Sequence, residues 1–325
     1  LDDASTADLV RPTRASYFTY WWLFNFDPQF DAAYEPDNWK LAVNNEAFRL
    51  SIARGIDRAK AEFPYEPNNP NANLINTITP EGFCDYSGTD YTQMGDLAAV
   101  SNTNPFNAEE ALQYKAQAIQ ELTAAGATFP IKMLMCYNPT SANWAQECQV
   151  VEQQIENVLG ADYVDIIIQA GPETGFLGAI RRTGNYAFMK CNWGADYADP
   201  ETWTDPFSTD SSYSFIFKST DPETQALYAE YTELVAAAKA ITDDMDARYT
   251  AFAKAEAFLL DHAFAVPFSI SSRNYQMCNL NVFEGQYASF GLANQRYKDQ
   301  HLYDTSMGLE EYQAAYAEWQ SKKAG

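Results

Sequence analysis

Four carboxylates lie close together in the segment NWGADYADPETWTDPF, residues 192–207. They are Asp196, Asp199, Glu201 and Asp205. A calcium-binding loop does not fit, because the sixth position counted from Asp196 is Glu201, where an EF-hand needs a glycine. Two carboxylates beside Trp193 and Trp203 could serve glycoside cleavage. Their spacing by itself does not establish that chemistry.

Three of these carboxylates have an ordinary structural explanation. Asp199-Pro200-Glu201 is typical of the start of a helix or turn, so we expect Asp199, Glu201 and Asp205 to cap backbone groups or to face water. Asp196 differs, because the apolar and aromatic run NYAFMKCNW ends just before it. An ionised carboxylate in apolar surroundings is costly unless something pairs with it. Asp196 is therefore either a loop aspartate exposed to water or a carboxylate that awaits a cation from outside the chain.

The run before Asp196 is predicted to be a strand, and this gives the second interpretation a geometry. A strand that ends at Trp193 and Gly194 leaves backbone N–H and C=O groups able to pair with an extended ligand. Asp196 would lie at the end of that row of groups. A carboxylate there is placed to accept a ligand's ammonium group.

Other recognisable catalytic or metal-binding patterns are missing from the sequence. It contains no G-x-S-x-G, G-x-x-x-x-G-K, G-x-G-x-x-G or H-E-x-x-H motif. Its two histidines, His262 and His301, are expected to be solvated or to cap a helix. The five cysteines have no metal-ligand spacing, and their odd number leaves at least one thiol without an internal partner. We expect no metal and no cofactor, and for Cys148 a buried thiol is favoured over a disulfide.

Composition restricts the class of protein. The 325 residues are 46% hydrophobic and 15% aromatic, which is enough for one large core or two medium ones. With 21 basic and 44 acidic residues the formal net charge is −23, which repels nucleic acid and anionic membrane surfaces. No apolar run approaches the ~18 residues of a membrane span, and the first residues lack the features of a secretion signal. Any targeting segment is expected to have been removed or to lie upstream.

Periodicity predicts a mixed α/β protein, with several strands in a sheet flanked by helices. A helix capped by Asn44 or Asn45 should end before Pro64, and a long ordered excursion anchored by Phe83, Tyr86 and Tyr91 should follow it. The other predicted helices cover 107–126, 141–160, 172–182, 221–241, 243–263 and 309–325. The predicted strands cover 131–137, 163–169, 185–193 and part of 264–277. The strand, helix, strand succession from 131 to 169 implies a parallel pair with a right-handed crossover.

Two finer expectations concern the helices. Asn107 and Glu110 have the spacing of a capping box, and Leu112, Ile119 and Leu122 should form the buried face of the helix that follows. In the helix over 141–160, the apolar stripe is expected to contain the following residues: Trp144, Cys148, Val151, Ile155 and Val158.

The segment GNYAFMKCNWGADYADPETWTDPF resembles the ligand-holding segment of the extracellular oligopeptide- and dipeptide-binding proteins of ABC importers. Three other stretches are similar to that family in order and spacing. They are NNEAFRLSIARGIDRAK, NPFNAEEALQYKAQAIQELTAAG and DDMDARYTAFAKAEAFLLDHAFAVPFSIS. No single one of these four stretches is strongly specific for the family. Their occurrence together, in the same order and at similar spacing, is specific. The resemblance covers about residues 17 to 275 well and the tail loosely.

The resemblance implies a periplasmic-binding-protein-like lobe, part of an architecture with two lobes that close around a ligand like a hinge. By the same resemblance, Asp196 would accept the α-ammonium of a peptide and Trp193 would wall the cleft. The backbones of Asn192 and Gly194 would add the peptide as an extra strand. Tyr197 is included in the candidate ligand-binding site. So is Lys190, which lies where some relatives carry a pocket-facing arginine.

At its beginning, this chain differs in length from the family it resembles. Intact members are considerably longer, and the part preceding YFTYWWLFNF normally builds most of the other lobe. We therefore expect residues 1–20 to enter from a missing first lobe and residues 21–275 to form the C-terminal ligand-binding lobe. Residues 276–325 would be a returning segment with a C-terminal helix.

The resemblance implies a binding protein rather than an enzyme. It would capture short peptides outside the cell and deliver them to a membrane ABC permease. It would act as a monomer, anchored through an upstream lipoprotein signal, and without nucleic acid. One alternative keeps the fold and replaces the peptide by an oligosaccharide, because 7 tryptophans and 21 tyrosines would suit stacking on sugars. A less favoured alternative is a carbohydrate hydrolase that uses Asp196.

Overall fold

The computed structural model describes residues 6–13, 17–208, 212–213, 216, 218–271, 275–284 and 297–323. The chain forms two compact units. The larger unit comprises Thr19–Trp193 and Asp199–Ile270, and the smaller comprises Leu1–Phe18, Gly194–Ala198 and Ser271–Gly325. The expected divisions were at residues 20 and 275. That the terminal segments belong to another lobe stays a prediction.

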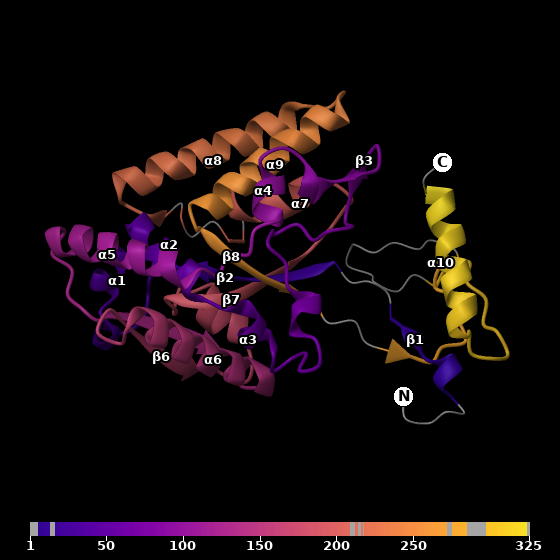
Figure 1. The fold of residues 1–325 in the computed structure, drawn as a ribbon, viewed down its shortest axis with the longest axis horizontal. Coiled ribbons are helices and arrows are strands. Elements are labelled where there is room, and N and C mark those ends of the chain that lie inside the picture. The colour runs from indigo at the N-terminus through magenta and orange to yellow at the C-terminus, as the bar shows by residue number, and fades with distance from the viewer. Residues whose placement is uncertain are drawn as a thin grey trace. The chain divides into compact units, whose positions relative to one another are not determined.

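A three-stranded sheet in the order β7-β2-β8 forms the centre of the larger unit (Figure 1). Its strands are β7 (Phe188–Gly194), β2 (Phe18–Phe24) and β8 (Ala265–Ile270), and β2 pairs antiparallel with β8. Trp21, Trp22 and Phe24 of β2 are fully buried. The sequence analysis did not predict β2, because a strand buried on both faces lacks the alternation that marks a half-exposed one.

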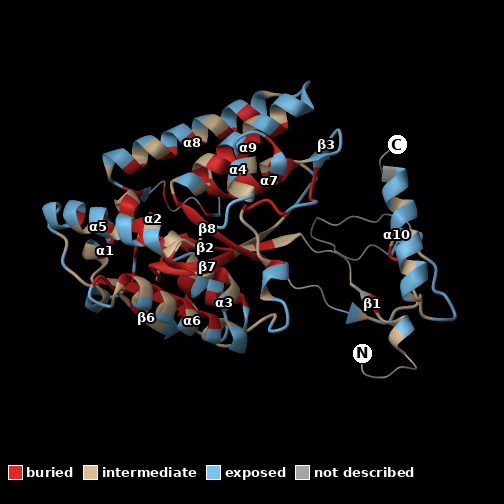
Figure 2. Cartoon of the chain, viewed as in Figure 1, coloured by how far each residue is buried: buried red, intermediate tan, exposed pale blue. Residues whose placement is uncertain are grey.

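A second sheet confirms the predicted parallel pair. Strands β5 (Ile131–Tyr137) and β6 (Val164–Ala170) pair in parallel, with Ile131 opposite Val164. Helix α6 (Ala142–Leu159) connects them, and α5 (Ala108–Ala124) precedes them. Figure 2 shows most of the buried residues gathered in the larger unit around the two sheets.

Three details of the early helices differ from the prediction. The helix expected up to Pro64 is divided into α2 (Glu46–Gly55) and α3 (Arg58–Glu62), because Ile56 is extended and Asp57 caps a new helix. In α5 the Asn107 cap is confirmed, but the buried face consists of Ala111, Ala118 and Leu122. Leu112 is 48% exposed, so its assignment to the core was wrong. Helix α1 (Pro36–Asn44) precedes α2.

The long excursion after α3 is ordered, as predicted, and it contains only short elements. They are η3 (Pro70–Asn73), β3 (Asp85–Tyr86), β4 (Thr89–Asp90), η4 (Tyr91–Gln93) and α4 (Leu97–Ser101). Phe83 and Tyr91 are buried anchors, whereas Tyr86 is 39% exposed and is not one. The fully buried Glu256 fixes the excursion, since it accepts hydrogen bonds from the backbone of Ile78 and Thr79 and from Tyr91.

Two long helices complete the larger unit, and both were predicted. They are α8 (Pro222–Ala240) and α9 (Met245–Asp261). The shorter elements are η2 (Ala32–Tyr34), the π-helical turn η5 (Leu177–Arg181), α7 (Glu201–Thr204) and η6 (Asp205–Phe207). Figure 1 shows the three-stranded sheet with α8 and α9 on one side and α3 and α6 on the other.

The smaller unit has few buried residues among those the structure describes. It contains η1 (Ala7–Leu9), a short antiparallel pair of β1 (Arg11–Pro12) and β9 (Tyr275–Gln276), and helix α10 (Leu309–Lys323). The guanidinium of Arg11 donates to Leu280 O and lies over the ring of Tyr312. Helix α10 confirms the predicted terminal helix, and most of its residues are exposed (Figure 2).

Candidate functional site

Strand β7 has one edge that no other strand of its sheet covers, because it is the first strand in the order β7-β2-β8. Ala187 precedes β7 and bonds in two directions, because its O accepts from Asn25 N at 2.9 Å and its N–H donates to Leu134 O of β5 at 2.8 Å. Strand β5 thus lies beside the start of β7. Peptide addition would use the backbone groups of Asn192 and Gly194, near the other end of β7. That use stays a prediction. We call residues 192–194 the β7 edge.

Tyr213 is the side chain that meets the β7 edge. Its hydroxyl donates to Asn192 O at 2.6 Å. Its ring lies edge-on to Trp193, with centroids 6.1 Å apart, and also edge-on to Trp21 at 5.4 Å. Arg181 donates to the Tyr213 hydroxyl, and its guanidinium carbon lies 4.9 Å from the centre of that ring. The sequence analysis missed both Arg181 and Tyr213, which lie before and after the segment that resembles the family's ligand-holding strand.

The residues after β7 have a different environment. Asp196 and Tyr197 are exposed. Gly194 is required by close packing, because a Cβ atom there would lie 2.9 Å from the ring of Phe18. Residues Gly194–Ala198 group with the smaller unit, whereas Asn192 and Trp193 belong to the larger one. The contact of Asp196 with a ligand ammonium stays a prediction.

Lys190 points into an internal ion pair. Its ammonium group bonds to Glu147 Oε2 and, at 2.6 Å, to the hydroxyl of Tyr65. The side chain of Glu147 is fully buried, and its second oxygen accepts from Trp22 Nε1 at 3.1 Å. Four aromatic rings lie within 6 Å of the ammonium: Tyr20, Tyr65, Trp144 and Phe268. In this structure Lys190 thus meets a carboxylate of its own chain.

The sequence contained a signal for Glu147 that the analysis did not use. Glu147 lies four residues before Val151 and eight before Ile155, so it belongs to the buried face of α6. A carboxylate on such a face requires a buried partner. The partner is a lysine on a strand far along the chain, which helical periodicity cannot reveal.

A second buried carboxyl, Glu62, lies near this pair. Its side chain accepts a hydrogen bond from Asn73 at 3.0 Å, and the residue is 2% exposed. Burial raises the pKa of Glu62 to about 7, and the Glu147 carboxylate adds to that rise. Hydrogen bonds from Asn73 and Ser269 and the charge of Lys190 oppose the rise. Burial in the core thus keeps the Glu62 carboxyl protonated to a pH well above the usual range of a carboxyl group.

The remaining acidic residues of the 192–207 segment form ion pairs. Arg248 binds Asp199 Oδ2 at 2.9 Å and Glu201 Oε2 at 2.7 Å, and Asp199 also accepts from the backbone of Glu201. Asp205 pairs with Lys239 at 3.0 Å. The expected capping is therefore found for Asp199. Glu201 and Asp205 pair with cations from α8 and α9, and the side chain of Asp205 stays 45% exposed to water, as expected.

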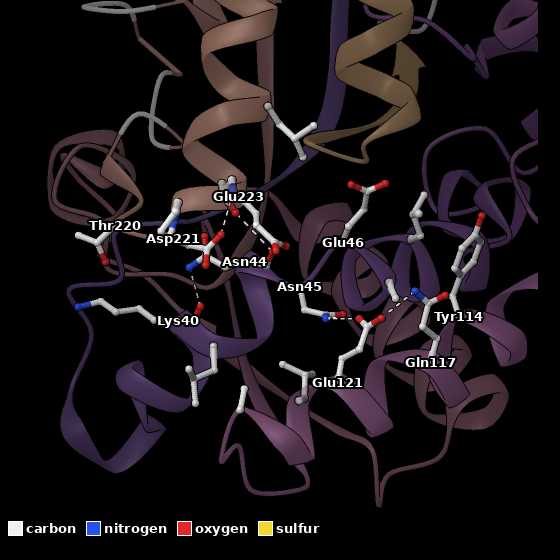
Figure 3. A pocket seen from close by; sticks show the side chains of 18 residues that line it. Lys40, Asn44, Asn45, Glu46, Tyr114, Gln117, Glu121, Thr220, Asp221 and Glu223 are labelled. Atoms are coloured by element: carbon white, nitrogen blue, oxygen red, sulfur yellow. Dashed lines mark hydrogen bonds between the residues drawn. The ribbon is translucent and has the colours of Figure 1, made fainter.

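A separate pocket of about 810 Å³ lies between α1, α2, α5 and the start of α8 (Figure 3). Its acidic lining residues are Glu46, Glu121, Asp221 and Glu223. Asp221 caps α8 by accepting from Thr224 N at 2.8 Å, and Glu121 accepts from the Asn45 side chain at 2.6 Å. Glu46 in turn bonds to His262, so three of these carboxylates already bond to groups of the chain itself. None of the predicted site residues lines this pocket.

The histidines and cysteines form no site among the described residues. His262 Nδ1 lies 3.0 Å from Glu46, and His301 Nδ1 lies 3.3 Å from Glu284. The described part of the chain contains no group of His, Cys, Asp and Glu that could hold a metal ion. Four of the five cysteines are buried free thiols, and burial raises the pKa of Cys191 to about 12. Within the described residues, no helix has the length and apolar character needed to cross a membrane.

Comparisons with known proteins were made for sequence and for structure. No family model matches the chain. Oligopeptide-binding protein AmiA of Streptococcus pneumoniae is 30% identical over 316 residues, which are 88% of this chain and 48% of that protein. Oligopeptide-binding protein AliA of the same organism is 29% identical over 316 residues, 87% of this chain and 48% of that protein. The chain belongs to the oligopeptide-binding protein family. It spans about half the length of the curated relatives that it matches.

Solved structures show that the family fold extends over most of the chain. The substrate-binding domain of an oligopeptide ABC transporter from Bacillus anthracis matches with a TM-score of 0.68 at 20% identity, over 91% of this chain and 51% of that one. Listeria monocytogenes OppA bound to peptide matches with a TM-score of 0.65 at 20% identity, over 92% of this chain and 51% of that one. The fold is therefore mixed α/β and periplasmic-binding-protein-like, as predicted.

Proposed function

We propose that this member of the oligopeptide-binding family captures short peptides and delivers them to a membrane ABC permease, without covalent chemistry. The observation that carries the proposal is the β7 edge. The carbonyl of Asn192, near the end of β7, accepts a hydrogen bond from the Tyr213 side chain, and the exposed Asp196 follows four residues later. AmiA and AliA are named as oligopeptide-binding proteins and the Listeria OppA structure is bound to peptide, which supports a peptide as the ligand here.

Each part of the β7 edge would recognise one feature of a peptide. The backbone groups of Asn192 and Gly194 would pair with the peptide backbone, which binds peptides largely independently of their sequence. Asp196 would take the α-ammonium through a charge-assisted hydrogen bond. Trp193 would lie along the peptide as an apolar wall. Tyr213 already bonds to Asn192 O, so the peptide would use the second lone pair of that carbonyl or replace the hydroxyl.

We take the proposed location, oligomeric state and membrane anchoring of the protein from the family. The protein would act outside the cell, as a monomer, anchored through a lipoprotein signal, and would close around its ligand together with a second lobe. The burial of four tryptophans weakens the oligosaccharide alternative. Trp21, Trp22, Trp39 and Trp203 are at most 1% exposed, so they are packed inside and do not offer stacking surfaces.

The experiment compares peptides with a free or an acetylated amino terminus, both with an amidated carboxyl terminus. The 15N-labelled chain is titrated with each peptide and followed by NMR, which detects weak binding. We expect dissociation constants of roughly millimolar for this chain, about −4 kcal/mol. Asp196→Asn should weaken the free-amino peptide by up to about fivefold, the limit for a solvent-exposed ion pair. Binding of the acetylated peptide should not change.

The matched control is Asp37→Asn, because the side chain of Asp37 is 99% exposed on α1 and lies far along the chain from β7. It should leave both peptides unaffected. An equal loss for free and acetylated peptides in Asp196→Asn would remove Asp196 from the proposed role. Absence of binding by the unmodified chain at about 10 mM peptide would contradict peptide capture by the β7 edge in this chain.

A further inference from the structure

A smaller pocket of the larger unit combines an apolar wall with charges of both signs. It holds about 240 Å³ and lies between α2, α4, the end of α9 and the start of β8. Ten of its fifteen lining residues are apolar, so a ligand there would meet a mainly apolar surface. The charged lining residues are Arg54, Asp96 and Asp261. None of residues 192–197 lines this pocket, which is therefore separate from the β7 edge.

The two carboxylates of this pocket have unfavourable surroundings. Asp96 stands at the capping position of α4, yet its side chain makes no capping hydrogen bond. Asp261 is the last residue of α9, where the helix dipole places partial negative charge and disfavours a carboxylate. Burial raises the pKa of Asp261, against the opposing charges of His262 and Arg54. The charge of Asp96 adds to that rise, so a cation from outside the chain would relieve repulsion here.

Arg54 brings incompletely used hydrogen-bond donors to the same pocket. Its Nη1 donates to Pro105 O at 3.4 Å, which is long for a hydrogen bond. Its Nε is buried, lies 3.4 Å from Glu110 Oε2 and has no hydrogen-bond partner among the described residues. Buried donors without a partner are rare in native proteins and call for an explanation such as a ligand. In the part of the chain that the structure describes, no ion pair joins Arg54 to Asp261, although both line this pocket.

We propose that this pocket binds a free α-amino acid with an apolar side chain, such as leucine. Arg54 would receive the α-carboxylate, Asp261 together with Asp96 would receive the α-ammonium, and the apolar wall would take the side chain. A simple cation would leave the buried Arg54 donor without a partner, and a simple carboxylate would meet two like charges. A metal ion is not favoured, because the described residues include no group of His, Cys, Asp and Glu that could hold one. The inference goes beyond the proposed function, since it concerns a second ligand at a second site.

The test uses ligands that share a side chain and differ in charge. The 15N-labelled chain is titrated by NMR with L-leucine, with leucine amide, which lacks the carboxylate, and with N-acetylleucine, which lacks the ammonium. We expect a dissociation constant of roughly millimolar for leucine, and binding of each analogue weaker by about three- to tenfold. The amide signals of Arg54, Val100 and Ala263 should shift. Equal binding of the three ligands, no leucine binding at about 50 mM, or shifts confined to 190–197 would overturn the inference.

Variants assign each charge of the ligand to its partner. Arg54→Gln should abolish the advantage of leucine over its amide. Asp261→Asn should reduce the advantage of leucine over N-acetylleucine and leave part of it, because Asp96 remains. An advantage that stays unchanged in its variant would contradict that residue's role.

The matched controls remove the same charges elsewhere on the chain. Lys254→Gln is the control for Arg54, because Lys254 is exposed on α9 and does not line the pocket. Asp243→Asn is the control for Asp261. Asp243 is exposed before the start of α9, whose 17 residues separate it from Asp261 by about 25 Å at 1.5 Å per residue. Both controls should keep both advantages of leucine, and a loss in either would contradict the assignment.

Urea unfolding distinguishes a ligand contact from a purely structural role of Asp261. Because Asp261→Asn removes a charge that the helix dipole and Asp96 disfavour, the urea midpoint of the ligand-free chain should stay the same or rise while leucine binding weakens. A lower midpoint would show that the carboxylate supports the fold and would overturn its ligand role. Should Arg54→Gln not give a folded NMR spectrum, Arg54→Lys decides: a reduced advantage of leucine over its amide supports the inference, and an unchanged one contradicts it.

Discussion

Glu62 should make the stability of this protein fall as the pH rises from 5 to 8. The folded state raises the pKa of its carboxyl from 4.5 to about 7, mainly through burial. Because the folded state then holds the proton more tightly than the unfolded state, the stability from this group is fully present below pH 4.5. It is lost progressively as the pH rises towards 7 and changes no further above it.

The size of the effect follows from the pKa difference. A shift of one unit corresponds to about 1.36 kcal/mol. A rise from 4.5 to about 7 therefore costs up to roughly 3 kcal/mol of unfolding free energy at alkaline pH, of which about 2.5 kcal/mol is lost between pH 5 and pH 8. Glu62 is 2% exposed, so solvent screening reduces this value little.

The assay is urea unfolding of the unmodified chain and of Glu62→Gln at pH 5, 6, 7 and 8. Glutamine keeps an oxygen that can accept from Asn73 and removes the titration. Burial also raises the pKa of Glu152, Glu256 and Asp261, and these groups act alike in both proteins. The difference in unfolding free energy between the two proteins isolates Glu62. It should move by about 2.5 kcal/mol in favour of the variant, and parallel pH profiles would refute the reasoning.

Two further predictions concern the buried polar groups of the larger unit. Lys190→Met should leave the Glu147 charge without a partner and cost about 3–5 kcal/mol in urea unfolding, and adding Glu147→Gln should restore much of that loss. A cost below about 1 kcal/mol would show that the pair does not stabilise the core. Glu256→Ala should remove the carboxylate that accepts hydrogen bonds from several residues of the 64–96 excursion. The free energy of unfolding should fall by about 3 kcal/mol or more, and a protease should cleave the excursion faster. Glu256→Gln should have a smaller effect on both. Unchanged cleavage would contradict that anchoring role.

Local patterns predicted the regular elements well and the sheet less well. The parallel pair β5–β6 and the helices α5, α6, α8 and α9 follow from periodicity and caps, which are properties of neighbouring residues. Strand β2 escaped notice because it is buried on both faces, and α2 and α3 were merged because the cap at Asp57 lies inside an otherwise helical pattern.

The candidate site shows the same limit. The sequence could identify the end of β7 and Asp196, because they are adjacent in the chain. It could not reveal that Tyr213 bonds to Asn192, that Arg181 stacks on Tyr213, or that Lys190 meets Glu147. Each of these contacts joins residues separated along the chain, and only the fold brings them together.

The most direct test of peptide capture at the β7 edge is to map the peptide's contacts. An isotope-edited NMR experiment with a 13C-labelled, free-amino tripeptide would record which protein protons lie close to the bound peptide. We predict contacts to the backbone amides of Asn192 and Gly194 and to the indole N–H of Trp193. Contacts confined to the pocket around Asn45 and Glu121, with none along 192–196, would contradict the central claim.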